Sequence, residues 1–309
     1  MSQSDLRAKY GPNAYDVGRR MQGPNFDQRV AERDALDPHF TRAWVDFAIN
    51  GMYARKALDT RSRLLVLTGQ YTMAKSHAML EDTIRPAVEA KVDPREVLEI
   101  VLQCIVYGGH TTVEPAIKVF HRVATDLNLL DSLKKSALPL DGTNSKRNEQ
   151  DERNNRWHAD DRADPRTEDL VKRHGWLAVS RGLVLRPKHH LNVLEFLDKI
   201  DPEFAGLWVR FCYGDMYTRS IVDDKTRLLC MIGDCLAVGE ATQSRGHMRG
   251  AMRNGASPKE VLEVVLQTCV NFGMPSMLHA LEMFVQIMHE DGRLAEIGNP
   301  PIAVKSYSK

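Results

Sequence analysis

Three polar side chains between residues 240 and 247 could together carry out acid–base chemistry. Glu240 and His247 are seven residues apart, so on a helix they share one face, about 10 Å apart along its axis. Gln243 lies between them at spacings that make neighbours on a helix surface. A carboxylate, an amide and an imidazole in this order could move a proton beside a small substrate. A solvated polar helix face is the alternative interpretation.

Other candidates concern substrate binding and metals. Arg219 and Arg249 could each hold a substrate carboxylate, and Arg219 could instead hold a helix end. His110 follows two glycines, which allow a ligand or backbone to approach closely. His189 and His190 are adjacent and would not share a helix face, so no metal site is expected there. The chain has no phosphate-binding or dinucleotide-binding motif, and neither a metal nor a cofactor is expected.

Helices must position these residues, because the apolar periodicity is helical throughout. Phe204, Leu207, Trp208 and Phe211 follow the i, i+3, i+4, i+7 pattern of one helix face. Ser257 begins a capping box, with proline next and glutamate three residues later. No convincing alternating strand pattern occurs. The sequence therefore predicts an all-α fold.

The chain also repeats itself. Residues 37–120 recur without a gap as residues 201–284, so that the segment 94–99 falls on 258–263. We therefore predict a tandem repeat of two helical units, each of about five or six helices. The positions equivalent to the three polar residues are Ser76, Met79 and Thr83, which supply neither acid nor imidazole. Only the second unit is expected to be catalytic.

The predicted organisation is a first helical unit at 1–138, a polar linker at 139–168, and a second unit at 169–309 with an extended C-terminal tail. The linker is dense in mixed charge and poor in aliphatic residues. Residues 1–24, punctuated by glycine and proline, are expected to be extended.

Composition narrows the class of protein. The 309 residues carry a net charge of +1, which offers no electrostatic case for nucleic acid or an anionic membrane. No stretch approaches the roughly 20 apolar residues of a membrane-spanning helix. The N-terminus lacks an apolar leader, and the five cysteines form no Cys-x-x-Cys pair. These features predict a reduced, cytoplasmic protein.

Two motifs resemble the carboxymuconolactone decarboxylase family, which includes the alkyl hydroperoxidase-D-like proteins. They are GHMRGAMRNGASPKEV at 246–261 and EVVLQTCVNFGMP at 263–275, preceded by an Asp-x-x-(Thr/Ser)-Arg segment in each unit. The resemblance implies all-helical units in rings, with sites near unit interfaces, and for a two-unit chain a homotrimer. It places the family histidine at His247. The cysteine pair of the peroxidase branch is replaced by Glu240 and Gln243, which excludes thiol chemistry at this site. Decarboxylases commonly have glutamate where this chain has Gln243.

The resemblance implies a cofactor-independent decarboxylase acting on a small carboxylated lactone in aromatic-compound catabolism. Electrons left by departing CO2 would delocalise onto the carbonyl of the lactone. His247 would donate the proton, with Glu240 as its partner or base and Gln243 donating to the oxyanion. The alternatives are an isomerase or lactone hydrolase running on the same groups, and a non-catalytic oligomeric scaffold.

Overall fold

The computed structural model describes residues 1–138, 164–298 and 300, and these residues form helices and no strands. The all-α prediction is therefore confirmed. The first unit contains α1 (Gln3–Tyr10), α2 (Pro12–Gln22), α3 (Phe26–Leu36), α4 (Pro38–Trp44), the π-helix η1 (Val45–Tyr53), α5 (Thr60–Met73), α6 (His77–Glu89), α7 (Pro94–Gln103), α8 (Ile105–Gly108), α9 (His110–Asp126) and α10 (Leu130–Lys135). The second contains α13 (Arg166–His174), α14 (Trp176–Leu185), α15 (Pro187–Ile200), α16 (Pro202–Val209), the π-helix η2 (Arg210–Met216), α17 (Asp224–Ala237), α18 (Ala241–Arg253), α19 (Pro258–Phe272), α20 (Met274–Glu290) and the 3-10 helix η3 (Leu294–Ile297).

Corresponding helices begin at corresponding capping side chains. Asp37 accepts a hydrogen bond from the Phe40 amide at 2.9 Å, and Asp201 accepts one from the Phe204 amide at 3.0 Å. Asp59 and Asp223 cap α5 and α17 in the same way. Each carboxylate satisfies a backbone N–H that has no partner within its helix. Both units also continue α4 or α16 directly into a π-helix.

The first 24 residues are helical, which corrects the expectation that they are extended. Gly11 ends α1 and begins α2 at a φ of 98°, and Gly175 does the same between α13 and α14 at 87°. These glycines mark helix boundaries, because their positive φ suits a glycine cap. The same pairs of short helices thus precede the repeated segment in both units, and each unit has more helices than expected.

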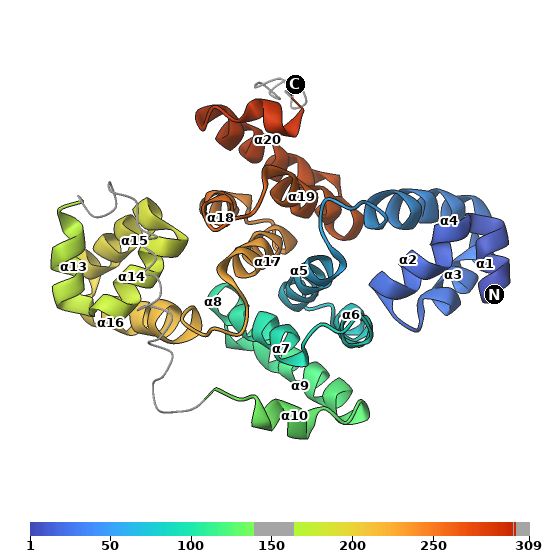
Figure 1. The fold of residues 1–309 in the computed structure, drawn as a ribbon, viewed down its shortest axis with the longest axis horizontal. Helices are drawn as coiled ribbons and strands as arrows, with labels where there is room; N and C mark the ends of the chain where they lie inside the picture. Colours follow the sequence, from blue (N-terminus) through green and yellow to red (C-terminus); the bar gives the residue numbers. More distant parts are fainter. Residues whose placement is uncertain (139–163, 299, 301–309) are drawn as a thin grey trace.

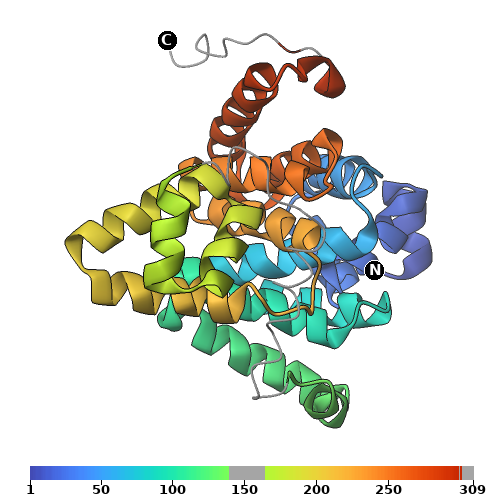
Figure 2. The same cartoon turned by 60° about the vertical axis from the view of Figure 1, so that its left-hand side comes forward.

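The centre of the molecule is the contact between α5 and α17, one helix from each unit (Figure 1). Helices α1–α4 and α13–α16 form lobes on opposite sides of this pair (Figures 1 and 2). Both central helices are buried along almost their whole length. The structure thus builds one shared core across the two units.

Two buried ion pairs cross this core in reciprocal fashion. Arg63 of α5 binds Glu263 of α19 at 2.9 Å, and Arg227 of α17 binds Glu99 of α7 at 2.8 Å. All four side chains are at most 1% exposed. Each unit therefore supplies the acid that neutralises the buried arginine of the other.

The predicted linker falls largely on 139–163 and the predicted C-terminal tail on 299 and 301–309, which lie outside the described residues. Helix α13 already begins at Arg166, inside the range assigned to the linker. No helix in the described part of the chain is long and apolar enough to cross a membrane.

Candidate functional site

A cavity of about 190 Å³ lies where the first unit meets the α13–α16 lobe of the second. Its lining residues are Val106, Tyr107, Arg186, His189, Val193, Trp208, Tyr213 and Gln243. Val106 and Tyr107 come from α8 of the first unit, whereas the others come from the second. The cavity therefore needs both units.

The hydroxyl of Tyr107 lies 2.7 Å from Nε2 of His247, across the unit boundary. The two rings meet edge to face, with centroids 5.4 Å apart. His247 is fully buried on α18, and its Nδ1 has no hydrogen-bond partner among the described residues. Tyr107 thus lines the cavity and also contacts the buried imidazole of His247.

Arg186, at the end of α14, places a positive charge on the cavity wall. Its side chain is 7% exposed, and within the described ranges no carboxylate lies within 4.0 Å of it. Its Nη2 donates to the backbone oxygen of Gln243 at 3.4 Å, while Nε has no partner there. A Cβ added at Gly246 would lie 2.7 Å from this Nε, so glycine makes room for the guanidinium.

Burial sets the protonation states of the site. It lowers the pKa of His247 well below 6.5, and the charges of Arg186 and His189 lower it further. Burial also raises the pKa of Tyr107 well above 10, against the opposing charge of Arg186. At neutral pH the site therefore holds a neutral imidazole and a protonated phenol beside a guanidinium.

Aromatic rings complete the second-unit side of the cavity. The π-helix η2 contains Tyr213 and is followed directly by Tyr217. The ring centroids of these two tyrosines are 5.3 Å apart. His190 is fully buried beside Tyr213, with centroids 4.3 Å apart, and burial lowers the pKa of His190 to about 3. π-Helical segments often occur at functional sites, because their extra residue redirects side chains.

The first unit has a corresponding cavity of about 460 Å³ with different chemistry. Corresponding residues of the two cavities are Gln22 and Arg186, Arg29 and Val193, Trp44 and Trp208, Met79 and Gln243, and Asn271 and Tyr107. In this first-unit cavity, Asn271 from α19 of the second unit accepts hydrogen bonds from Tyr71 at 2.8 Å and Tyr53 at 3.3 Å, and Thr83 stands at the position of His247. The buried polar groups here satisfy one another, whereas those of the second unit include unpartnered atoms.

The structure brings two of the three predicted catalytic residues to one site. Gln243 lines the cavity, and His247 lies directly behind Tyr107. Glu240 is exposed at the start of α18, and the hydrogen bond of the His247 imidazole goes to Tyr107. The imidazole therefore has a phenol from the other unit as its hydrogen-bond partner.

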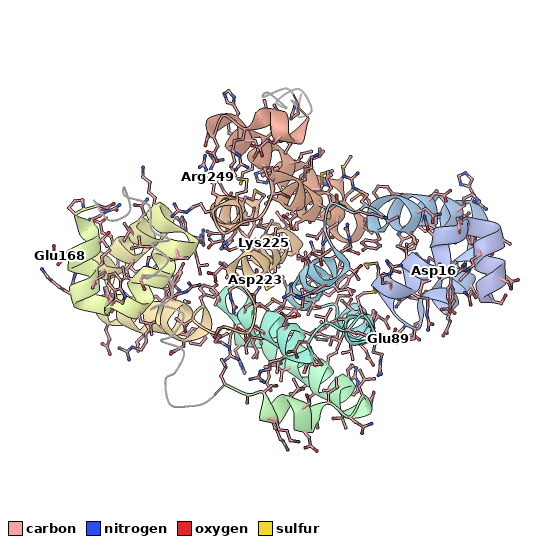
Figure 3. The ribbon with its side chains drawn as sticks, in the orientation of Figure 1. Asp16, Glu89, Glu168, Asp223, Lys225 and Arg249 are labelled. Carbon is pink, nitrogen blue, oxygen red and sulfur yellow. The ribbon has the colours of Figure 1, made fainter. Side chains whose placement is uncertain are left out.

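The predicted substrate-binding residues lie elsewhere. Nε of Arg219 donates to the buried carboxylate of Glu99 at 2.8 Å, so this arginine takes part in the ion pairs between the two units. Arg249 lies on the outer side of α18 and binds Glu290 and, at 3.0 Å, Asp291 (Figure 3). His110 is exposed at the start of α9. None of the three lines the cavity.

Sequence reasoning missed Tyr107, Arg186 and Tyr213. The glycine pair after Tyr107 was a usable signal, because it ends α8 at the cavity. Arg186 lies just before His189 and His190, and the sequence patterns interpreted above assign it no role. Among the described residues, no three His, Cys, Asp or Glu side chains gather closely enough to hold a metal ion.

Comparisons with known proteins agree with the family resemblance of the two sequence motifs. The sequence pattern of the carboxymuconolactone decarboxylase family matches residues 202–286. The chain is 29% identical to 4-carboxymuconolactone decarboxylase of Acinetobacter baylyi over 109 residues, which is 35% of this chain and 81% of the relative. It is 30% identical over 97 residues to an uncharacterized 15.0 kDa protein of Paracoccus denitrificans, covering 31% of this chain and 72% of the relative.

The chain belongs to the carboxymuconolactone decarboxylase family. The matched segment contains His247 and Gln243 but neither Tyr107 nor Arg186. The cavity is therefore completed by residues outside the matched region.

Proposed function

We propose that the protein is a cofactor-independent carboxy-lyase that removes CO2 from a small carboxylated lactone. The observation that carries the proposal is the Tyr107–His247 hydrogen bond at the wall of a small cavity that also holds a buried arginine. Similarity to a 4-carboxymuconolactone decarboxylase supports the reaction type.

The reaction needs an acid that reaches the substrate, and Tyr107 is the proposed group. Cleavage of the carbon–carboxylate bond releases CO2 and leaves an electron pair that delocalises onto the lactone carbonyl. Tyr107 then gives its hydroxyl proton to carbon, and the phenolate is stabilised by Arg186 and by a hydrogen bond from His247. Solvent returns the proton to Tyr107. His247 acts as a positioning residue, since Tyr107 separates it from the cavity.

Gln243 and Glu240 have supporting roles in the proposed reaction. Gln243 lines the cavity and could donate its amide to the enolate oxygen. Glu240 stays a proposed second acid–base group, and Glu240→Gln measures its contribution. Because Glu240 is exposed and the imidazole bonds to Tyr107, we expect a smaller loss from this variant than from His247→Ala.

The first assay follows 4-carboxymuconolactone by its ultraviolet absorbance and measures released CO2 in the same sample. We expect both signals to change together in a one-to-one ratio. An absorbance change without CO2 would indicate an isomerase, and a change with net release of one proton would indicate a lactone hydrolase. No change with this lactone and a series of related lactones would contradict the lyase proposal and favour a non-catalytic scaffold.

We also propose that three two-unit chains form a ring, as the family resemblance implies. Exposed apolar side chains at matched positions support an interface: Leu36 and Ile200 are 87% and 67% exposed, and Phe40 and Phe204 are 54% and 50% exposed. Two similar but distinct faces on one chain suit head-to-tail contacts that close into a ring.

Light scattering on the unmodified protein should give three times the mass of the chain. Phe204→Glu should lower the measured mass, whereas Met274→Glu, at another exposed position, should leave it unchanged. A monomeric mass for the unmodified protein would contradict the ring.

A further inference from the structure

Among the residues that the structure describes, Arg186 has no acidic partner for its buried charge. A buried guanidinium without an acidic partner is costly, because burial removes water without supplying a counter-charge. Burial opposes the charge of Arg186, but a guanidinium is not deprotonated in proteins, so the charge persists. The side chain is 7% exposed, and Nε has no partner within the described residues.

The fold itself does not require this charge. The corresponding residue of the first unit is Gln22, which is also buried, at 4% exposed, and whose backbone oxygen accepts from Arg29 at 2.6 Å. A neutral amide therefore fits the same place between the same kinds of helices. What differs is the cavity: only that of the second unit combines the lone guanidinium with Tyr107 and His247.

We propose that Arg186 binds a carboxylate of the substrate and makes the cavity specific for small, planar organic anions. Nε–H is free, and together with a neighbouring Nη–H it offers the two parallel donors that a carboxylate accepts. Trp208 and Tyr213, with ring centroids 5.6 Å apart, provide flat apolar surface beside it. Arg186 is thus a specificity-determining residue outside the segment that defines the family.

The carboxylate that binds Arg186 and the carboxylate that leaves as CO2 must be two different groups of the substrate. This step rests on the proposed function. An ion pair with Arg186 stabilises a carboxylate and so opposes its loss as CO2. The departing carboxylate must therefore point elsewhere, toward the apolar wall formed by Val106, Val193 and Trp208. A substrate of this site consequently carries a second carboxylate, which stays on the product.

Calorimetric binding of two probes tests the anion site without turnover. Sorbate and sorbamide have the same planar six-carbon chain and differ in the charge of one end. The unmodified protein should bind sorbate at least about tenfold more tightly than sorbamide. Arg186→Gln, which copies Gln22, should reduce this preference to within about twofold, and Arg186→Lys should retain part of it.

Arg33→Gln is the matched control, because Arg33 lies over the Trp44 ring at 4.0 Å, and both residues line the first-unit cavity. This variant should keep the full preference for sorbate. Equal binding of the two probes by the unmodified protein, no binding of sorbate, or a preference that survives in Arg186→Gln would each overturn the proposal. The binding test measures no reaction, so its result does not depend on whether the lyase assay succeeds. Likewise, a failed binding test would not by itself contradict the lyase proposal.

Discussion

Replacing Tyr107 with phenylalanine is expected to lower kcat/KM for the lactone by about 10²- to 10⁴-fold, the usual contribution of a positioned acid. The variant keeps the ring on the cavity wall and removes the hydroxyl that lies 2.7 Å from His247. Steady-state kinetics on the purified variant measure the loss. Substrate binding should change much less, because the aromatic surface remains.

His247→Ala should cause a loss of similar size, and the double variant should be little worse than either single one. Residues that act as one unit give non-additive losses. Tyr71→Phe is the control, because it removes a buried hydroxyl that bonds to Asn271 at 2.8 Å in the first unit. It should leave kcat/KM within about twofold. Additive losses, or full activity of Tyr107→Phe, would show that this pair does not transfer the proton.

The pH profile provides an independent check on His247. Its pKa lies well below 6.5, chiefly because of burial, so the imidazole stays neutral at pH 6.5 and above. The rate should therefore hold between about pH 8 and 6.5 and fall only in more acidic solution, where a protonated imidazole places a second buried charge near Arg186. An acidic limb centred near 6.5 would contradict a buried, neutral imidazole.

Glu263→Gln is expected to destabilise the protein by about 3–5 kcal/mol, the typical result of removing one partner of a buried ion pair. Arg63 would keep its charge at 1% exposure, with the Gln267 amide oxygen at 2.9 Å and the backbone oxygen of Arg55 at 3.0 Å as its remaining partners. Urea unfolding should show a lower midpoint. Glu99→Gln should have a comparable effect, since Glu99 binds Arg227 in the reciprocal pair.

Glu168→Gln is the matched control for this pair of variants. Glu168 lies at the outer edge of the α13–α16 lobe (Figure 3), where it binds Lys172 with exposed fractions of 80% for Glu168 and 68% for Lys172. An exposed pair contributes little to stability, so the urea midpoint of this variant should match that of the unmodified protein. If Glu263→Gln is no less stable than Glu168→Gln, the reciprocal ion pairs do not stabilise the shared core.

Much of the fold was predictable because local signals agree with each other. Asp201 and Asp223 stand at helix starts, and the residues after them carry apolar side chains at helical spacing. The Ser257 capping box occurs in the structure with both of its hydrogen bonds. Such features involve neighbours within one or two turns, so the sequence alone determines them.

The N-terminal segment shows where local signals mislead. Gly11 and Gly23 suggested an extended chain, yet each ends a helix at a positive φ. The two helices are short, and much of their stability comes from packing, with Leu6, Tyr10 and Met21 almost fully buried in the core. A short helix of this kind depends on what it packs against, which lies elsewhere in the sequence.

Local patterns in the sequence were enough to predict the helical class, the repeat between the two units and the polar segment that contains Gln243 and His247. Which other groups meet that segment follows from long-range packing. Tyr107 lies 140 residues from His247, and Arg186 lies in the second unit before the repeated segment. The physical reason is that no local rule fixes which side chains two packed helices bring together. That depends on how α8 of one unit docks against α14 and α18 of the other.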